Sequence, residues 1–466
     1  MAFFEDLTKI PHGSGNTKAI SDYCVEFAKS HGYEYHQDSS NNVIIVCPPT
    51  AGYENSPTVI IQGHLDMVCE KDAEVKFDFT KDPLKLMVDG DYVTANGTTL
   101  GADDGIAVAM ALAVMDDANI PHPEIEAVFT VDEEVGLLGA TAIDASPLKG
   151  RIMLNIDSEV EGILTVSCAG GSTTKSIIPV NYTKTSGNIC KLTISGLAGG
   201  HSGVEIDKNR ANASILLGRL LYALSQTADI KICELEGGMK DNAIPSSASA
   251  VIMTNDDISE TISEYDKIFK NEYKTSDSGV TVRAQLLGSY QRSALDKKST
   301  KAVISYLNCI PNGIQRMSAE IDGLVQTSLN LGILRLSQEA MTASFSVRSS
   351  VGSEKNALNF RVAMITELLG GSVEISGEYP AWEYQPNSKL RTLMAEIYRE
   401  MYGKEPKIEA IHAGLECGVF CGKIEGLDCI SFGPDLPEIH TPRERMSISS
   451  VNRVWEYLLE VLKRLK

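Results

Sequence analysis

Five short segments place carboxylates and histidines at the ends of apolar runs. They are GHLD (His64, Asp66), GADDG (Asp103, Asp104), TVDEEVG (Asp132, Glu133, Glu134), NIDSEVEG (Asp157, Glu159, Glu161) and PEIHTPRE (Glu438, His440). Each segment alone has an ordinary explanation, because a histidine at a strand end is usually structural and acidic residues favour the start of a helix. Together, however, so many carboxylates in one cleft would repel one another unless cations neutralised them. The five segments therefore predict a shared metal site.

The ligand types indicate which metals this site would hold. Imidazole and carboxylate ligands without thiolate suit Zn²⁺, Mn²⁺ or Co²⁺. The candidates outnumber the ligands that one zinc needs, so two metals about 3.5–4 Å apart, bridged by a carboxylate and a water, fit better. Such a pair activates the water as a nucleophile, and a carboxylate outside the ligand set must then act as general base. Glu133, beside a ligating Glu134, is suitably placed for that role.

Strands and helices alternate around these segments and must position them. The apolar runs NVIIVC, TVIIQGH, IEAVFTV and RIMLNID predict buried strands, and the Ala-rich stretch from Gly101 to Met115 predicts a buried helix. This alternation is typical of an α/β fold in which helices flank a central sheet. Ligands of such sheets gather outside the carboxyl ends of the strands, and each of the five segments follows a strand-like run or opens a helix, so they could converge there. At the end of TVIIQGH, His64 and Asp66 would also share one face of the strand.

The middle of the chain has a different pattern. From about Asn181 it contains Thr-, Ser- and Ile-rich runs such as AVIMTN, VTVRAQLL and ASFSVRSS, which alternate like half-exposed strands of an antiparallel sheet. The first pattern returns after GEYPAWEYQP. We therefore predict an α/β catalytic domain over 1–180 and 379–466, interrupted by an inserted α+β domain over 181–378.

Composition narrows the classes of partner. The chain has 42 basic and 62 acidic residues in 466, a net charge of −20, which argues against nucleic acids and anionic membranes as partners. No apolar run approaches the roughly 20 residues of a membrane span, and the N-terminus does not resemble a signal peptide. None of the 10 cysteines falls in a CxxC pair, as is usual for buried thiols in a reducing compartment. We expect a soluble, cytoplasmic protein that acts on a small substrate.

Six motifs also resemble those of a known family. GHLDMV, LGADDGIAVA, DEEVGLLGA, NIDSE, GGHSG and PEIHTPRER follow one another over the whole chain. In these motifs the sequence is similar to the co-catalytic zinc peptidases that include carboxypeptidase G, carnosinase and the bacterial aminoacyl-histidine dipeptidases. The similarity is greatest to the aminoacyl-histidine (Xaa-His) branch, around QGHLDMVCEK and TTLGADDG. It implies a zinc-exopeptidase-like catalytic domain with a central mixed sheet and an inserted lid domain.

The resemblance implies a role for each residue of the metal site. Two divalent ions, zinc or else cobalt or manganese, would be held by His64, Asp103, Glu134, Asp157 and His440. Asp103 would bridge the two ions, with His64 and Asp157 on one and Glu134 and His440 on the other.

Further roles follow from the same resemblance. Asp66 would orient His64, and Glu133 would be the general base. The family also has a cis peptide after the bridging carboxylate, here Asp103–Asp104.

Three residues of the insert, and one in a loop beyond it, match substrate-contacting positions of the family. His201, in GLAGGHSG, would stabilise the oxyanion that forms on the scissile carbonyl. Asn242 and Arg348 would hold the C-terminal part of the substrate, with Arg348 pairing with a free carboxylate. Gly414, in HAGLECG, would line the same pocket.

The predicted function is hydrolysis of dipeptides, with Xaa-His substrates such as β-alanyl-histidine implied by the closest branch and broader dipeptidase activity also compatible. An aminoacylase or tripeptidase-like exopeptidase on the same scaffold is an alternative. A non-catalytic metal-binding protein is a second alternative, although pure binding needs no spare base such as Glu133. A homodimer through the lid domain is also expected to be possible, with His201 acting either in its own site or in that of a neighbour.

Overall fold

The computed structural model describes residues 1–466, which divide into two compact units. The first unit comprises Met1–Cys168, Trp382–Ala410 and Leu415–Lys466, and the second comprises Ala169–Ala381 and Ile411–Gly414. The insert that we predict over 181–378 lies inside the second unit, whose bounds are wider. The second unit begins before the predicted boundary at residue 181. Strand β8 (Ile163–Cys168) is followed directly by β9 (Gly170–Pro179) of another sheet, with no Pro- or Ser-rich linker between them.

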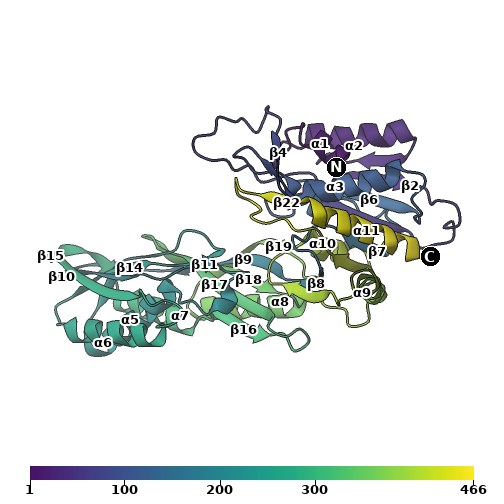
Figure 1. Cartoon of the computed structure of the whole chain (residues 1–466). Coiled ribbons are helices and arrows are strands. Elements are labelled where there is room, and N and C mark those ends of the chain that lie inside the picture. The colour runs from purple at the N-terminus through teal and green to yellow at the C-terminus, as the bar shows by residue number, and fades with distance from the viewer. The chain divides into compact units, whose positions relative to one another are not determined.

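A mixed sheet of eight strands forms the centre of the first unit (Figure 1). Its four middle strands run parallel to one another, and antiparallel strands flank them. The central mixed sheet predicted from the sequence is thus confirmed. In spatial order the strands are β1 (Glu34–Gln37), β2 (Val43–Cys47), β6 (Ile125–Thr130), β3 (Val59–His64), β7 (Ile152–Asn155), β21 (Asp428–Ser431), β8 and β20 (Lys407–Ile411).

Helices pack against this sheet. The predicted Ala-rich helix is α3, and nearly all of its residues are buried, as its small side chains permit. Helix α3 contacts β3, α2 contacts β1 and β2, and both α9 and α10 contact β21. The helices of this unit are α1 (Ala2–Leu7), α2 (Lys18–His31), α3 (Ala102–Asp116), α4 (Leu138–Ala142), α9 (Lys389–Tyr402), α10 (Glu416–Lys423) and α11 (Ile448–Arg464). A small sheet of β4 (Leu86–Asp89), β5 (Tyr92–Ala95) and β22 (Arg445–Ser447) completes the unit.

The second unit contains a nine-stranded sheet whose recorded pairings are all antiparallel. The antiparallel pattern that we predict for this region is therefore confirmed. The long strands β10 and β15 form one edge of the sheet (Figure 1). The spatial order is β15 (Thr281–Leu295), β10 (Tyr182–Ser195), β14 (Ala248–Thr254), β12 (Lys231–Gly237), β17 (Val325–Leu336), β18 (Ala340–Ser349), β9 and β19 (Ser372–Tyr379), with β16 (Gly313–Met317) beside β17.

Four helices and a short ribbon complete the second unit. Side chains of α5 (Ala213–Thr227), α6 (Ser259–Glu272), α7 (Lys297–Cys309) and α8 (Gly352–Leu368) share one apolar core with the sheet. Asn212 begins α5 and accepts hydrogen bonds from the backbone N–H groups of Ser214 and Ile215. A 3₁₀ turn (Ile206–Lys208) and the two-stranded ribbon of β11 (Gly200–His201) and β13 (Ala243–Ile244) lie outside the large sheet. No helix of either unit is both long and apolar enough to cross a lipid bilayer.

Candidate active site

The predicted metal ligands follow the carboxyl ends of the four parallel strands. β3 ends at His64 itself, β6 ends shortly before Glu133 and Glu134, and β7 ends two residues before Asp157. β21 leads into the loop that carries His440, while Asp103 lies at the start of α3. Because parallel strands end at the same edge of a sheet, segments far apart in the sequence meet at one place.

Asp103 lies between the two histidines. Its Oδ1 is 3.1 Å from Nε2 of His64, and its Oδ2 is 3.1 Å from Nε2 of His440. One carboxylate thus offers a separate oxygen to each imidazole, which is the arrangement that a bridging ligand requires. The peptide bond between Asp103 and Asp104 is cis, as the family resemblance implies.

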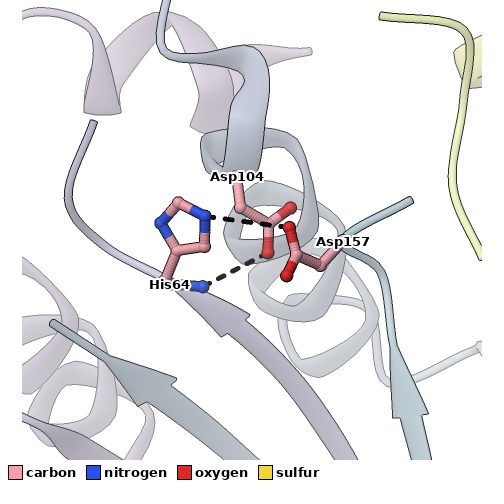
Figure 2. A group of neighbouring side chains, drawn as sticks. All are labelled: His64, Asp104 and Asp157. Atoms are coloured by element: carbon pink, nitrogen blue, oxygen red, sulfur yellow. Dashed lines mark hydrogen bonds and ion pairs between the residues drawn. The ribbon is translucent and has the colours of Figure 1, made fainter. Parts of the chain in front are cut away.

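Each histidine also lies near a second carboxylate. His64 Nε2 is 3.7 Å from Asp157 Oδ1, and His440 Nε2 is 3.0 Å from Glu134 Oε1. Figure 2 shows His64, Asp157 and Asp104 facing one another in front of α3. The ligand atoms of three overlapping groups lie within 4.8 Å of one another: His64, Asp104 and Asp157; His64, Glu133 and Glu134; and Asp103, Glu134 and His440.

The hydrogen bonds of His64 indicate that a cation belongs in the cluster. Its Nδ1–H donates to the backbone carbonyl of Asp66 at 2.9 Å, so a neutral imidazole would turn the lone pair of Nε2 toward Asp103 and Asp157. Lone pairs and carboxylate oxygens repel one another unless a positive charge lies between them. Oε1 of Glu134 is likewise buried without a hydrogen bond, although His440 is near. The donor set therefore fits metal ions.

The pKa values of the histidines and carboxylates in the cluster reflect the same excess of negative charge. Burial favours the neutral form of His64, but Asp103 and Asp66 outweigh it and raise the pKa of this imidazole well above its ordinary value. The hydrogen bond to Asp103 and the adjacent carboxylate of Glu134 raise the pKa of His440 to about 10. Burial raises the pKa of Asp157, and the neighbouring Asp104 raises it further. Raised pKa values at these groups are what a cluster suited to cations would have, because its carboxylates favour added positive charge.

Asp66 fixes the surroundings of His64 mainly through backbone groups. The side chain of Asp66 is 3.6 Å from His64 Nδ1, while the shorter bond from that nitrogen goes to the carbonyl oxygen of Asp66. The carboxylate accepts the hydroxyl of Ser14 at 2.7 Å and the N–H groups of Glu133 and Glu134 at 3.0 and 3.4 Å. Asp66 therefore links the loop after β3 to the loop that carries the proposed base and a proposed ligand, which the sequence spacing did not indicate.

Glu133 lies among the ligand groups with no recorded ion pair to its carboxylate. Burial raises its pKa to about 8, and the like charges of Glu416 and Glu134 act in the same direction. A carboxyl group whose pKa lies near neutrality can take up and release a proton under ordinary conditions.

Three further acidic residues, to which the sequence assigned no individual role, accept hydrogen bonds from groups around the cluster. Asp104 is fully buried and its Oδ2 accepts the backbone N–H of His64 at 3.2 Å. Glu444 accepts the backbone N–H groups of residues 100–103 at 2.7 to 3.4 Å and so holds the turn that presents Asp103. Glu416, at the start of α10, accepts Gln62 Nε2 at 2.5 Å and Thr130 Oγ1 at 2.6 Å. In the sequence, the position of Asp104 directly after the candidate ligand Asp103 was a signal of its role. Nothing in the sequence indicated a role for Glu416 or Glu444.

The second unit brings two of its predicted substrate residues together on the short ribbon. His201 pairs with Ala243 across β11 and β13, and the carbonyl of Asn242 accepts the N–H of Ser202 at 2.9 Å. Nδ1 of His201 accepts the N–H groups of Gly203 and Val204 at 3.2 and 3.3 Å. In the neutral imidazole the proton therefore lies on Nε2, and burial lowers the pKa so that the neutral form is favoured.

Arg348 and Gly414 meet at one tyrosine of the same unit. Arg348 is 9% exposed, its Nη1 donates to the hydroxyl of Tyr379 at 3.0 Å, and its buried Nε has no hydrogen-bond partner. A Cβ on Gly414 would lie 2.8 Å from the Tyr379 ring, so only glycine permits this close approach. No carboxylate lies within ion-pair distance of Arg348. Its charge does reach two imidazoles, those of His201 and His412, and lowers the pKa of both after burial has done so.

Known proteins are similar to this chain in sequence or fold over nearly its whole length. Residues 60–464 match the model of Peptidase family M20/M25/M40. The cytosol non-specific dipeptidase of Escherichia coli (strain K12) is 36% identical over 473 residues, which cover 99% of this chain and 96% of that protein. The crystal structure of aminoacylhistidine dipeptidase from Vibrio alginolyticus matches with a TM-score of 0.92 at 36% identity, over 99% of this chain and 95% of that one. The aminopeptidase PepT from Bacillus cereus shares the fold, with a TM-score of 0.56 at 16% identity over 99% of this chain and 96% of that one.

Proposed function

The chain belongs to peptidase family M20/M25/M40, and from this premise we propose that it hydrolyses dipeptides with two divalent metal ions bound between its parallel strand ends. The resemblance to aminoacyl-histidine dipeptidases that the motifs indicate is confirmed by the match over 99% of the chain. The observation that carries the two-metal proposal is Asp103, whose two oxygens face two different histidines at 3.1 Å each.

The proposed ligands are those predicted from the sequence: His64, Asp103, Glu134, Asp157 and His440. Zinc bonds of about 2.0–2.2 Å at tetrahedral angles separate two ligand atoms by roughly 3.4 Å. The histidine–carboxylate distances of 3.0 to 3.7 Å are of this size, which supports the fit. When bound, the ions supply Lewis-acid polarisation of the scissile carbonyl and lower the pKa of a water.

Glu133 is the proposed general base. It takes a proton from the attacking water and delivers it to the nitrogen of the leaving amine, so that the proton count balances. Asp66 holds the backbone N–H of Glu133 and that of Glu134, and this keeps base and ligand at a fixed separation.

Residues of the second unit are the proposed substrate contacts. His201 donates its Nε2–H to the carbonyl oxygen as negative charge develops there. Arg348 pairs with the free carboxylate of the substrate, which satisfies the guanidinium that lacks an acidic partner in the protein. Asn242 and Gly414 line the same region. A single carboxylate site suits a short peptide better than a long chain, so we assign dipeptides as the substrate class.

Substrate choice within that class is a finer proposal. The relative from Vibrio is named for aminoacyl-histidine substrates and the relative from Escherichia coli is named non-specific. We propose broad dipeptidase activity that includes Xaa-His peptides such as β-alanyl-histidine. A panel of dipeptides, tripeptides and N-acyl amino acids tests this, and preferential hydrolysis of either of the last two classes would favour a tripeptidase or an aminoacylase instead.

The decisive experiment combines metal analysis with Glu133→Gln. We expect this variant to keep two metal ions per chain and to lose nearly all peptidase activity, because it lacks only the proton acceptor. Glu425→Gln, which neutralises an exposed acid of the first unit, serves as the matched control and should stay active. Full activity of the Glu133→Gln protein with metal bound would overturn the mechanism.

Zinc is the proposed native metal, with cobalt and manganese as the other ions that this ligand set suits. Elemental analysis of protein purified without added metal, followed by reconstitution of the metal-free protein with each ion, decides between them.

The exposed face of α8 supports a homodimer through the second unit. Phe360, Met364 and Leu368 are 64%, 64% and 84% exposed and form one stripe along the helix. The stripe is self-complementary about Met364, because antiparallel pairing of two copies places Phe360 opposite Leu368 and Arg361 opposite Glu367. A two-fold axis near Met364 would thus bury apolar side chains and join opposite charges at once.

Met364→Glu tests the dimer. We expect the wild-type protein to sediment as a dimer and this variant as a monomer, while Val88→Glu, at an exposed valine of the first unit, should leave the dimer intact. A wild-type monomer, or a dimer that survives Met364→Glu, would exclude this interface.

The location of the protein in the cell is inferred from its relatives. The name of the Escherichia coli relative places that protein in the cytosol, and we infer the same compartment here. All 10 cysteines of this chain are free thiols, as is usual in a reducing environment.

A further inference from the structure

Glu159 is an acid at the metal centre for which no role has yet been found. Its carboxylate belongs to none of the three ligand groups, yet it follows the proposed ligand Asp157 by two residues in the loop after β7, and its charge interacts with those of Asp103, Glu134 and His440. It is only partly buried, makes no recorded ion pair, and accepts a hydrogen bond only from its own backbone N–H. It is therefore an acid without a cationic partner beside the reaction centre.

The loop that carries Glu159 is held firmly on both sides of it. The hydroxyl of Ser158 bonds that of Ser431 at 2.8 Å, the carbonyl of Glu159 accepts the N–H of Leu436 at 2.9 Å, and the N–H of Glu161 donates to Asp435 at 2.8 Å. Three successive anchors fix the backbone that presents both Asp157 and Glu159. The Glu159 carboxylate is thus a positioned group rather than the tip of a mobile loop.

The other acids around the centre already have partners. Asp104 accepts the N–H of His64, and Glu416 accepts Gln62 and Thr130. Two more, Glu161 and Glu438, pair with Arg453 and Arg443. Among the acids that are neither ligands nor the proposed base, Glu159 is the one left to meet a cation from outside the protein.

A dipeptide carries such a cation at a defined place. Its free ammonium group lies two bonds from the scissile carbonyl carbon in an α-aminoacyl peptide and three bonds away in a β-aminoacyl peptide. An acid that binds this ammonium must therefore lie beside the centre that binds the carbonyl, without being one of the metal ligands. Glu159 satisfies both conditions.

We infer that Glu159 binds the free amino group of the substrate and so makes the enzyme selective for peptides with an unblocked N-terminus. This inference rests on the proposed dipeptidase function and names the feature of the substrate that the first unit recognises. An N-acyl amino acid lacks the ammonium and would leave the carboxylate of Glu159 desolvated without a partner. The same residue therefore separates a dipeptidase from an aminoacylase on this scaffold.

The test compares a dipeptide with its des-amino analogue, alanyl-alanine with propionyl-alanine. We measure kcat/KM for the dipeptide and the inhibition constant of the analogue, in wild type and in Glu159→Gln. We expect the variant to lower kcat/KM for the dipeptide about 10- to 100-fold, the usual effect of losing a charged hydrogen bond. The inhibition constant of the analogue should stay the same or fall, because glutamine removes the charge that the analogue leaves unpaired. Glu159→Asp retains the charge and should keep part of the activity.

Controls separate this role from general damage. Metal content must be the same in wild type and variant, and Glu425→Gln, at an exposed acid of the first unit, should change neither constant. If Glu159→Gln weakens dipeptide and analogue equally, or neither, the assignment of Glu159 is wrong while the proposed function stands. If wild-type protein hydrolyses no dipeptide at all, the proposed function itself fails.

Discussion

The two units of the protein carry candidate functional clusters of opposite charge. The cluster at the parallel strand ends of the first unit has more carboxylates than cations, and several of its acids have raised pKa values because burial and like charges disfavour ionisation. The cluster around Arg348 in the second unit has the reverse excess, a buried guanidinium whose Nε has no partner. The first cluster therefore suits cations, and the second suits an anion.

This contrast distinguishes two kinds of site. A carboxylate cluster that needs cations supplies reaction chemistry, because metal ions polarise carbonyls and activate water. A lone guanidinium supplies recognition, because it binds a carboxylate with defined geometry. Substitutions in the first cluster should therefore change metal content, whereas substitutions in the second should change substrate binding with the metals in place.

The largest effect is expected from Asp103→Asn in the first cluster. An amide in place of the bridging carboxylate removes a negative charge that both ions would share, so we expect loss of metal and a fall in activity of about 10³-fold or more. Elemental analysis and dipeptide hydrolysis measure the two effects. Asp117→Asn, at the exposed end of the same helix, is the control, and an Asp103→Asn protein that retains both ions would refute the bridging role.

A smaller effect, confined to binding, is expected from Arg348→Met in the second cluster. Loss of a charge-assisted pair with the substrate carboxylate should reduce kcat/KM for dipeptides by about 100-fold while metal content stays at the wild-type level. Dipeptide amides, which lack the carboxylate, should lose little, and Arg283→Met on an exposed strand position serves as control. An equal loss of kcat/KM for free and amidated dipeptides would show that Arg348 does not bind the substrate carboxylate.

Asp66→Asn should weaken the first cluster without abolishing it. The asparagine keeps the backbone carbonyl that accepts His64 Nδ1–H but holds the N–H groups of Glu133 and Glu134 less strongly. Substitution of such supporting residues usually costs about 10- to 100-fold in metal affinity. Competition with a chelator of known affinity measures this change, and an unaltered affinity would confine the role of Asp66 to the fold.

The smallest effect concerns stability and pH in the protein without metal. The pKa of Glu133 is raised to about 8 and that of His440 to about 10, so the folded state favours their protonated forms. The stability that these shifts contribute is present below the ordinary pKa values and is lost as the pH rises through the shifted ones. Metal binding strengthens over the same range because it needs deprotonated ligands. The gain in Tm on adding metal, measured by calorimetry, should therefore grow by a few degrees as the pH rises from about 6 to 8, and a constant gain would count against the charge excess.

In the first unit, sequence patterns predicted the strands, the helix and the candidate ligands better than the residues that hold those ligands in place. Strand ends, the Ala-rich helix and the clustering of five acidic segments follow from local periodicity and from the way parallel strands end together. Glu444 and Glu416 could not be anticipated in this way, because their partners are backbone N–H groups and buried amides hundreds of residues away. The start of the second unit at Ala169 escaped prediction because two strands of different sheets follow each other there with a single residue between them.

The distance in sequence between Glu444 and the turn that it holds has a consequence for biosynthesis. Residues 100–103 are made early, whereas Glu444 and His440 leave the ribosome only after all of Ala169–Ala381 has been synthesised. A nascent chain can therefore form most of the first sheet but cannot complete the metal centre. Prematurely terminated chains lack Glu444, which holds the turn that presents Asp103, and the proposed ligand His440. Such chains therefore remain without hydrolytic activity until translation has passed these residues.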